Sequence, residues 1–401
     1  MKFNKTVGII CEYNPFHSGH RYQIEEVRSL GFDRIVCVMS GNSVQRGEFA
    51  ITDKYTRAEM AVNGGADLVL ELPFPYSSSS AEFFALAGVR ILENAGVDAI
   101  CFGSECGDID KLRKAANVCE SEGFADNYKE LISRGMGATK AFFEAYECIS
   151  KEKLPGGAND ILAIAYLRAL KKEHSQIEPI AIKRKGSDYR DTSIEKLDEH
   201  PSATMLRNCL LKSGIDDNFG KNVPEKTFDA LKKAVDCGKA PVKMSNLDSA
   251  IIASFRLFDF EKLENIADVG GGLGRKILSA AHDAVTYEEL VYSAAGKHYT
   301  EARVRRAILN ILIGVSSDDL KAYPAYTTVL GFNDIGREIL SELRKKERIP
   351  FITKPADAVA LGDEAKRQKE LSDRCDSLFT LALPLKSVSA EYVKRSPFIK
   401  Q

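Results

Sequence analysis

Residues 7–20, VGIICEYNPFHSGH, carry the pattern that decides the fold. The stretch begins as an apolar run of strand length, 7–12, and passes through a tight turn into a helical segment over 19–30. Such runs, when they alternate with helices, are typical of parallel strands buried on both faces. The sequence therefore predicts an α/β domain with a doubly wound, Rossmann-like parallel sheet. The other segments of this pattern are strands at 34–39, 67–72 and 98–102 and helices at 55–62 and 81–94.

The rest of the chain is richer in helical patterns. Helical segments near 108–121, 138–149 and 159–172 precede one more strand at 177–183 and a helix at 202–212. We expect residues 1–215 to form the α/β domain, with a helical insertion before its last strand. Residues 216–401 are expected to form a second, mainly helical domain, with a small α/β tail at 329–332 and 349–353. A chain of 401 residues has room for both, at about 150 residues per domain.

The composition excludes several classes of protein. The 56 Lys and Arg residues nearly balance the 57 Asp and Glu residues, so the formal net charge is −1. This balance excludes a uniformly basic nucleic-acid-binding protein and an acidic disordered chain. No apolar run approaches the roughly 18 residues of a membrane-spanning helix, and the first residues read directly into a strand rather than as a secretory leader. We therefore expect a cytoplasmic protein with no membrane partner.

The nine cysteines are scattered along the chain, and several lie inside apolar runs, such as Cys37 and Cys101. We expect free thiols rather than a disulfide framework. Cys101 and Cys106 lie near each other, but no second Cys or His pair stands at the spacing of a zinc site. No protein-bound metal is therefore expected.

The tetrad His17-Ser18-Gly19-His20 lies where the first strand gives way to a helix. Gly19 allows a ligand to approach the backbone, and the start of a helix offers unpaired N–H groups to an anion. Two imidazoles can donate to phosphate oxygens and stabilise charge as a phosphoanhydride breaks. Two ordinary loop histidines are the alternative. Ligands bind at the carboxyl ends of strands in open α/β sheets, so the tetrad predicts a nucleotide site with His17 and His20 as catalytic residues.

A second phosphate element is expected after the last predicted strand. Ser202, Thr204 and Arg207 stand at the start of a helix, where hydroxyl groups and a guanidinium can hold leaving phosphates. A plain capped helix is the alternative. We predict that these three residues bind phosphate.

The combination of H-x-G-H with a late Ser/Thr-x-x-Arg element resembles the nucleotidylyltransferase superfamily. The similarity extends to the bacterial tRNA(Met) cytidine acetate ligase family over most of the chain, including SGNSVQRGEFAITDKYTRAEM, CFGSE, GGANDILAIAYLRAL and IKRKGSDYRD. This resemblance implies that ATP activates acetate as acetyl-adenylate and that pyrophosphate is released. We expect Mg²⁺ to balance the charge of the phosphates. The acetyl group then passes to N4 of the wobble cytidine of elongator tRNA(Met).

The resemblance also implies which residues bind ATP. Outside the opening stretch they are Gly103 at a strand end, Asn159 at a helix start and Arg184 after the last strand, all at one sheet edge. Taken alone, each would be read as a strand-end glycine, a helix cap or a surface arginine. Within the opening stretch the implied residues are Val7, Gly8, Ile9, Ile10, Cys11, Glu12, Tyr13, Asn14, Pro15, Phe16, His17, Ser18, Gly19 and His20.

Basic clusters point to an RNA partner. They lie at 183–190, 297–306 and 344–348, and such clusters fit an RNA backbone, with a solvated surface as the alternative. The preferred tRNA contacts are Lys297, Arg303, Arg305 and Arg306.

Three other features stay open or carry no site. Segments 45–48 and 53–57 follow the second strand. Ordering of the loop, contact with acetate and reception of tRNA are alternative roles for them, and a solvated loop without a functional role is equally consistent with the sequence. Residues 270–274 fit no phosphate-loop motif and are expected to form a turn. No residue is singled out as a general base, since positioning and electrostatics can carry much of such catalysis.

The rival functions are an adenylyltransferase acting on a small phosphorylated metabolite and a non-catalytic RNA-binding protein on a nucleotide-binding fold.

Overall fold

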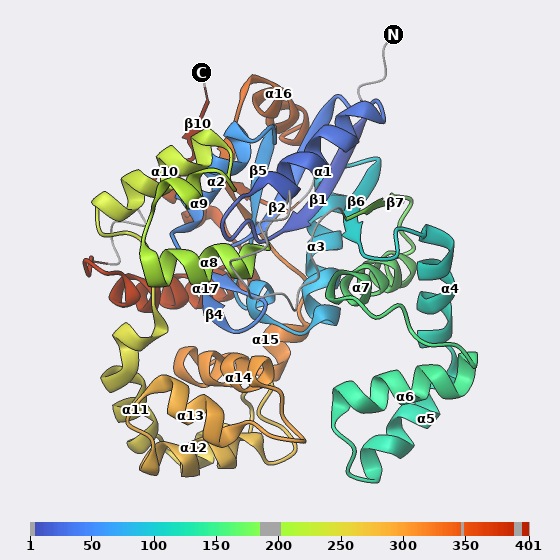
Figure 1. The fold of residues 1–401 in the computed structure, drawn as a ribbon, viewed down its shortest axis with the longest axis vertical. Coiled ribbons are helices and arrows are strands. Elements are labelled where there is room, and N and C mark those ends of the chain that lie inside the picture. Colours follow the sequence, from blue (N-terminus) through green and yellow to red (C-terminus); the bar gives the residue numbers. More distant parts are fainter. Residues whose placement is uncertain (1–4, 185–201, 346–348, 389–394, 401) are drawn as a thin grey trace.

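The computed structural model describes residues 5–184, 202–345, 349–388 and 395–400 (Figure 1). Its centre is a sheet with the strand order β10-β8-β5-β2-β1-β6-β7, in which β9 also pairs with β8. The strands are β1 Thr6–Cys11, β2 Arg34–Ser40, β5 Leu68–Leu72, β6 Ala99–Ser104, β7 Glu178–Lys183, β8 Thr327–Phe332, β9 Phe351–Ile352 and β10 Phe398–Ile399. A small separate hairpin consists of β3, Ser43–Val44, and β4, Glu48–Phe49.

The predicted parallel sheet is confirmed for the five strands from β5 to β7. Val7 of β1 pairs with Ile35 on one side and with Ala99 on the other. The chain leaves β1 for β2 and β5 on one side and returns to β6 and β7 on the other side. The order of the strands therefore reverses beside β1, and a crevice opens at the carboxyl ends of β1 and β6.

Helices cover both faces of the sheet, as the unbroken apolar strands predict. Ile9 packs in the core beneath α1 and α2, whereas Ile10, on the opposite face, packs in the core beneath α3 and α7. The helices around the sheet are α1 Ser18–Ser29, α2 Lys54–Asn63, α3 Ala81–Ala95, α4 Ile109–Cys119, α7 Ala158–Lys172, α8 Ala203–Ser213, α9 Asp217–Gly220, α10 Glu225–Asp236, α15 Ser317–Lys321, α16 Asp334–Leu343 and α17 Asp363–Ala382.

Two groups of helices extend away from the sheet in the lower half of Figure 1. One contains α5, Glu122–Ser133, and α6, Ala138–Ser150. The other contains α11 Asp248–Arg256, α12 Leu273–Asp283, α13 Tyr287–Ala294 and α14 Glu301–Ile313. On the last of these helices Val304, Ile308 and Ile311 form a buried apolar stripe.

The C-terminal strands join the central sheet rather than a tail of their own. The run expected at 329–332 forms β8, which pairs antiparallel with β5, and β10 adds in parallel to β8. Both strands expected in the C-terminal α/β tail therefore form, and β8 attaches them to the central sheet. The physical reason is that none of the strands before residue 215 covers the outer edge of β5, and an open edge leaves backbone groups unpaired. The division of the chain near residue 215 stays a prediction.

Two simpler expectations are confirmed. All nine cysteines are free thiols, and Cys37 and Cys101 are among the buried ones. Gly271 and Gly272 adopt positive φ angles of 71° and 92° in a turn directly before α12. Within the described ranges, no helix is both long enough and apolar enough to cross a membrane.

Candidate active site

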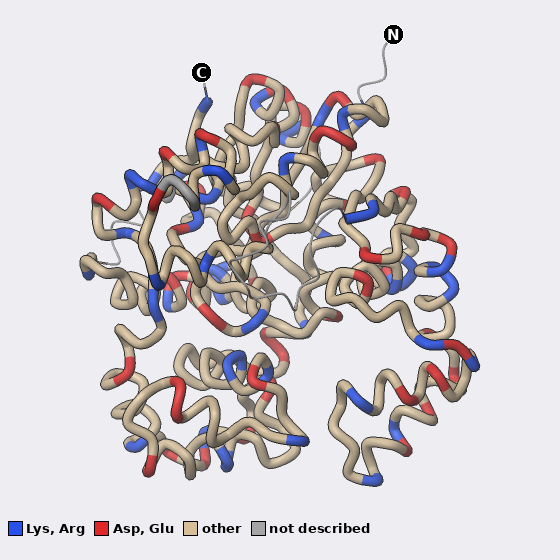
Figure 2. The backbone as a smooth tube through the Cα atoms, viewed as in Figure 1, with Lys and Arg blue, Asp and Glu red and all other residues tan. Residues whose placement is uncertain are grey.

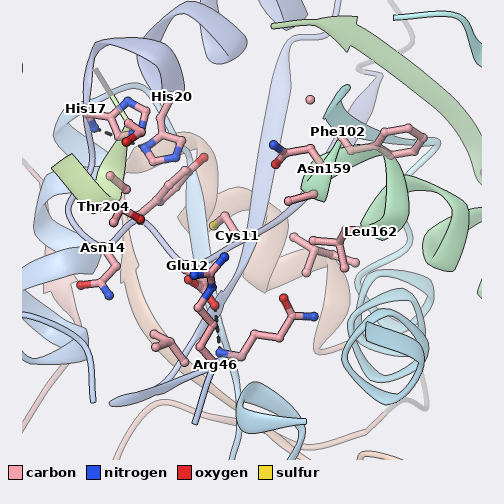
Figure 3. A pocket seen from close by; sticks show the side chains of 18 of the residues that line it. Cys11, Glu12, Asn14, His17, His20, Arg46, Phe102, Asn159, Leu162 and Thr204 are labelled. Carbon is pink, nitrogen blue, oxygen red and sulfur yellow. Dashed lines mark hydrogen bonds between the residues drawn. The ribbon is translucent and has the colours of Figure 1, made fainter. Parts of the chain in front are cut away.

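A pocket of about 250 Å³ opens in the crevice beside β1 (Figure 3). Its wall is assembled from the ends of β1 and β6, the starts of α1, α7 and α8, and the β3–β4 hairpin. Of the residues predicted outside the opening stretch, the pocket brings together Gly103, Asn159, Arg184, Ser202, Thr204 and Arg207. From the opening stretch it takes Ile10, Cys11, Glu12, Tyr13, Asn14, His17 and His20.

The remaining residues of the opening stretch do not line this pocket. Gly19 lines a small adjoining pocket together with His17, His20 and Arg184. Gly8 lies under α3, where a Cβ atom would stand 2.5 Å from Leu92 Cδ2, so its role is close packing. The others, which build the strand, the turn and the helix start, are Val7, Ile9, Pro15, Phe16 and Ser18.

The two histidines form a reciprocal cap at the start of α1. His17 Nδ1 accepts a hydrogen bond from Gly19 N at 3.0 Å, and His20 Nδ1 accepts one from His17 N at 3.3 Å. Their rings stack with centroids 3.7 Å apart. Because each Nδ1 accepts a backbone proton, the neutral rings carry their own proton on Nε2. The spacing of the tetrad thus presents two imidazole Nε2–H donors beside the start of a helix.

The electrostatic surroundings keep His20 neutral. Burial, reinforced by the nearby His17 and Arg184, lowers the pKa of His20 well below its usual value. His20 therefore acts as a hydrogen-bond donor rather than as a cation at neutral pH. Positive charge comes instead from Arg184, whose Cγ would lie 3.4 Å from a Cβ atom at Gly103. The glycine at the end of β6 lets this arginine lie close over the strand.

The residues of the predicted phosphate element form hydrogen bonds within the protein. Ser202 Oγ caps α8 by accepting a hydrogen bond from Met205 N at 3.2 Å. Arg207 donates to the carbonyl oxygen of Asn14 at 2.8 Å and to Thr204 Oγ1 at 3.1 Å. Arg207 therefore joins α8 to the turn before His17. Phosphate binding by these residues stays a prediction.

Glu105 and Asp160 position Asn159, and sequence reasoning missed both residues. Helix α7 begins after Gly157, which has no side chain to cap it, and the carboxylate of Glu105 takes that role. It accepts from Asn159 Nδ2 at 2.6 Å, from Asn159 N at 3.2 Å and from Asp160 N at 2.8 Å. The buried Asp160 carboxylate accepts in return from Glu105 N at 2.9 Å.

Gly157 completes this arrangement, since a Cβ atom there would lie 2.2 Å from Glu105 Cδ. The signal in the sequence is the pair CFGSE and GGAND, with a carboxylate in the first segment and glycines in the second.

Residues 53–57 order the loop beneath the pocket. The fully buried Arg57 guanidinium donates to the carbonyl oxygens of Glu12 at 2.6 Å, Ser40 at 3.0 Å and Thr52 at 3.3 Å. Burial lowers the pKa of Arg57 to about 10, so it stays protonated. Lys54 pairs with Glu71 at 2.7 Å inside the protein. The contacts of residues 53–57 therefore fit the alternative in which they order the loop. In the other segment, Gln45, Arg46 and Glu48 line the pocket.

The hairpin that carries these three residues is held by α14. Gly47, with a φ of 79°, packs so tightly that a Cβ atom would lie 2.3 Å from Arg306 N. Arg305 is buried and pairs with Glu288 at 2.7 Å and with Glu48 at 3.2 Å. The helical group thus contacts the wall of the pocket through one short hairpin.

The four predicted tRNA contacts are placed differently from one another. Arg305 pairs as described above, and Arg306 pairs with Asp268 at 3.2 Å, so both charges are compensated within the protein. Lys297 is exposed, and Arg303 lies half-buried over the Tyr299 ring at 5.3 Å. Figure 2 shows basic and acidic residues interspersed in this view. Contact of any of the four with tRNA stays a prediction.

Parts of the other basic clusters cannot be placed. Lys185, Arg190 and residues 346–348 lie outside the described residues. Within the part of the chain that is described, no group of three or more His, Cys, Asp or Glu residues could hold a metal ion.

Comparisons with known proteins identify the family of the chain. The HIGH nucleotidyl transferase family matches residues 4–394. The tRNA(Met) cytidine acetate ligase of Acetivibrio thermocellus is 38% identical over 395 residues, covering 94% of this chain and 95% of that protein. The tRNA(Met) cytidine acetate ligase of Caldanaerobacter subterraneus subsp. tengcongensis is 40% identical over 366 residues, covering 88% and 89%.

Two crystal structures of Thermotoga maritima TmcAL have the same fold. The apo form superposes with a TM-score of 0.91 at 29% identity, covering 98% of this chain and 99% of that chain. The form bound with alpha-thio ATP superposes with a TM-score of 0.89 at 28% identity, with the same coverage of 98% and 99%.

Proposed function

The chain belongs to the HIGH nucleotidyl transferase family and, within it, to the tRNA(Met) cytidine acetate ligases, and on this basis we propose its reaction. It is an ATP-dependent ligase that activates acetate and acetylates N4 of the wobble cytidine of elongator tRNA(Met) in the cytoplasm. The observation that carries the proposal is the pocket beside β1, which gathers His17, His20, Gly103, Asn159, Arg184 and the start of α8.

In the activation step, a carboxylate oxygen of acetate attacks the α-phosphorus of ATP. The bond from that phosphorus to the bridging oxygen breaks, and pyrophosphate leaves with the electron pair. The Nε2–H groups of His17 and His20 and the positive end of α1 are suited to bind the phosphate oxygens as charge develops on them. Arg184 adds a permanent positive charge at the same wall. No covalent intermediate with the enzyme is required.

Mg²⁺ would enter as part of the substrate. Among the described residues, the carboxylates in the pocket lining are Glu12 and Glu48, and Glu48 is already paired with Arg305. Magnesium usually keeps several water ligands and binds through substrate phosphates. We therefore propose that the ion is carried by the phosphate oxygens of ATP, where it balances their charge.

In the transfer step, the cytidine amine meets the acetyl group of acetyl-adenylate. The base must be presented unstacked, as in other enzymes that modify a base. Among the predicted contacts, Lys297 and Arg303 are the ones whose placement best suits binding of the RNA backbone.

ATP–pyrophosphate exchange tests the proposed function. Exchange is expected to depend on acetate and to be lost in His20→Ala, with the melting temperature close to that of the wild type. Exchange that responds to a phosphorylated metabolite and not to acetate would indicate the rival adenylyltransferase. Absence of any exchange in the wild type would indicate a binding protein without this catalytic activity.

A further inference from the structure

Acetyl transfer, as set out in the proposed function on which this inference rests, needs a proton acceptor. The cytidine N4 amine becomes an amide, so one of its protons must leave as the new bond forms. A side chain that accepts such a proton has to lie in the pocket with an unshared oxygen or nitrogen lone pair. Among the described residues that line the pocket, the candidate groups are two histidines, a thiol, two phenols and the carboxylates.

The two histidines are unsuited to this role. Their Nδ1 atoms accept backbone hydrogen bonds at 3.0 and 3.3 Å, and their Nε2 atoms carry the ring protons. Both rings therefore face the ligand as donors.

The thiol and phenol groups of the lining also keep their protons. Burial raises the pKa of the Cys11 thiol and of the Tyr13 and Tyr166 hydroxyls well above their usual values. At neutral pH none of the three is an anion. The acceptor must therefore be a carboxylate.

Among the described residues, two carboxylates line the pocket, and one of them is compensated. Glu48 Oε1 lies 3.2 Å from Arg305 Nε, in the contact that fixes the hairpin to α14. Glu12 is different, because only its Oε1 has a partner, Gln45 N at 2.9 Å. Glu12 Oε2 has no hydrogen-bond partner within the described ranges. It is not one of the side-chain atoms that are both buried and without a partner.

Glu12 is also held in place by its backbone. It directly follows β1, and its carbonyl oxygen accepts from the buried Arg57 at 2.6 Å. Figure 3 shows Glu12 facing the same space as the two histidines, next to the hairpin that carries Arg46. We propose that Glu12 is the catalytic base of acetyl transfer.

The step balances with no further reactant. The N4 lone pair forms a bond to the acetyl carbonyl carbon, and the bond from that carbon to the AMP oxygen breaks. AMP leaves with the electron pair, and the N4 proton passes to Glu12 Oε2 and then to water. Activation needs no base, because acetate is already an anion at neutral pH.

The test separates transfer from activation. Synthetic acetyl-adenylate and an elongator tRNA(Met) transcript are supplied to the wild type, Glu12→Gln, Glu12→Asp and Glu48→Gln, and single-turnover acetylation is measured. ATP–pyrophosphate exchange with acetate is measured on the same proteins. In Glu12→Gln, transfer is expected to fall at least about 100-fold more than exchange, the usual worth of a general base. Glu12→Asp, which keeps a carboxylate, should recover part of the transfer.

Three results would overturn the proposal. Transfer by Glu12→Gln at the wild-type rate means that another group takes the proton. Equal losses of exchange and transfer mean that Glu12 serves ATP binding instead. A selective loss of transfer in Glu48→Gln assigns the base to that residue. If the wild type itself shows neither acetate-dependent exchange nor transfer, the proposed function fails, which is a separate outcome.

Discussion

Removal of the Glu105 carboxylate should weaken ATP binding through Asn159. In Glu105→Ala, the first turn of α7 loses its acceptor for Asn159 N and Asp160 N, and the Asn159 amide loses its partner at 2.6 Å. Loss of a helix cap costs about 1 kcal/mol of unfolding free energy. A hydrogen bond to a charged group contributes about 1.5–3 kcal/mol. Since Glu105 is half-buried, the lower part of that range applies.

A loss of about 2 kcal/mol in the positioning of Asn159 corresponds to ATP affinity about 30-fold weaker, because 1.4 kcal/mol is a factor of ten. Isothermal titration with ATP and chemical denaturation measure the two effects separately. Asp108→Ala is the matched control. Asp108 caps α4 by accepting from two backbone N–H groups at 3.1 Å, but it does not line the pocket. This variant should keep the wild-type ATP affinity.

Gly157→Ala provides the internal check. The added Cβ atom would lie 2.2 Å from Glu105 Cδ, so the variant should weaken ATP binding on its own. In the Glu105→Ala background the obstruction is gone, and the same change should have little effect. Wild-type ATP affinity in Glu105→Ala, or additive effects in the double variant, would refute the positioning role of Glu105.

Three further predictions concern the helical group, the RNA and pH. Arg305→Ala should lower the unfolding free energy by about 2 kcal/mol, because it leaves Glu48 unpaired at the hairpin, and thermal denaturation measures this. Lys297→Ala should leave the melting temperature unchanged, and both Lys297→Ala and Arg303→Ala should weaken tRNA binding and reduce its salt dependence in filter-binding assays. The lowered pKa of His20 means that the unfolded state gains a proton near pH 6.5 that the folded state does not take up. The unfolding free energy of the wild type should therefore fall, relative to that of His20→Gln, as the pH drops through that value. A difference in denaturation midpoint between the two proteins that stays constant from pH 5 to pH 8 would contradict this.

Local sequence pattern predicts the centre of the fold well. The unbroken apolar runs become β1, β2, β5, β6 and β7 within a residue or two, because strands buried on both faces leave no other arrangement of apolar residues. The H-x-G-H spacing likewise predicts a local structure, since His17 and His20 occupy the capping positions of one helix.

Contacts between distant parts of the chain are the features that pattern does not reveal. The partner of β5 is β8, more than 250 residues away, and only the need to cover an open edge connects them. Glu105 and Asn159 meet across a separation of 54 residues. The basic run on α14 predicts an RNA surface, but Arg305 forms ion pairs with carboxylates from other elements. Charge in a sequence does not show which charges are already paired.

The central claim is the acetylation of one cytidine in one tRNA, and the nucleosides of the product test it most directly. The purified protein is incubated with ATP, isotopically labelled acetate and an unmodified elongator tRNA(Met) transcript, and the digested RNA is analysed by mass spectrometry. Labelled N4-acetylcytidine is expected at the wobble position, approaching one per tRNA, and none is expected when ATP or acetate is left out. An RNA that carries no labelled nucleoside, under conditions in which the protein carries out acetate-dependent ATP–pyrophosphate exchange, would contradict it.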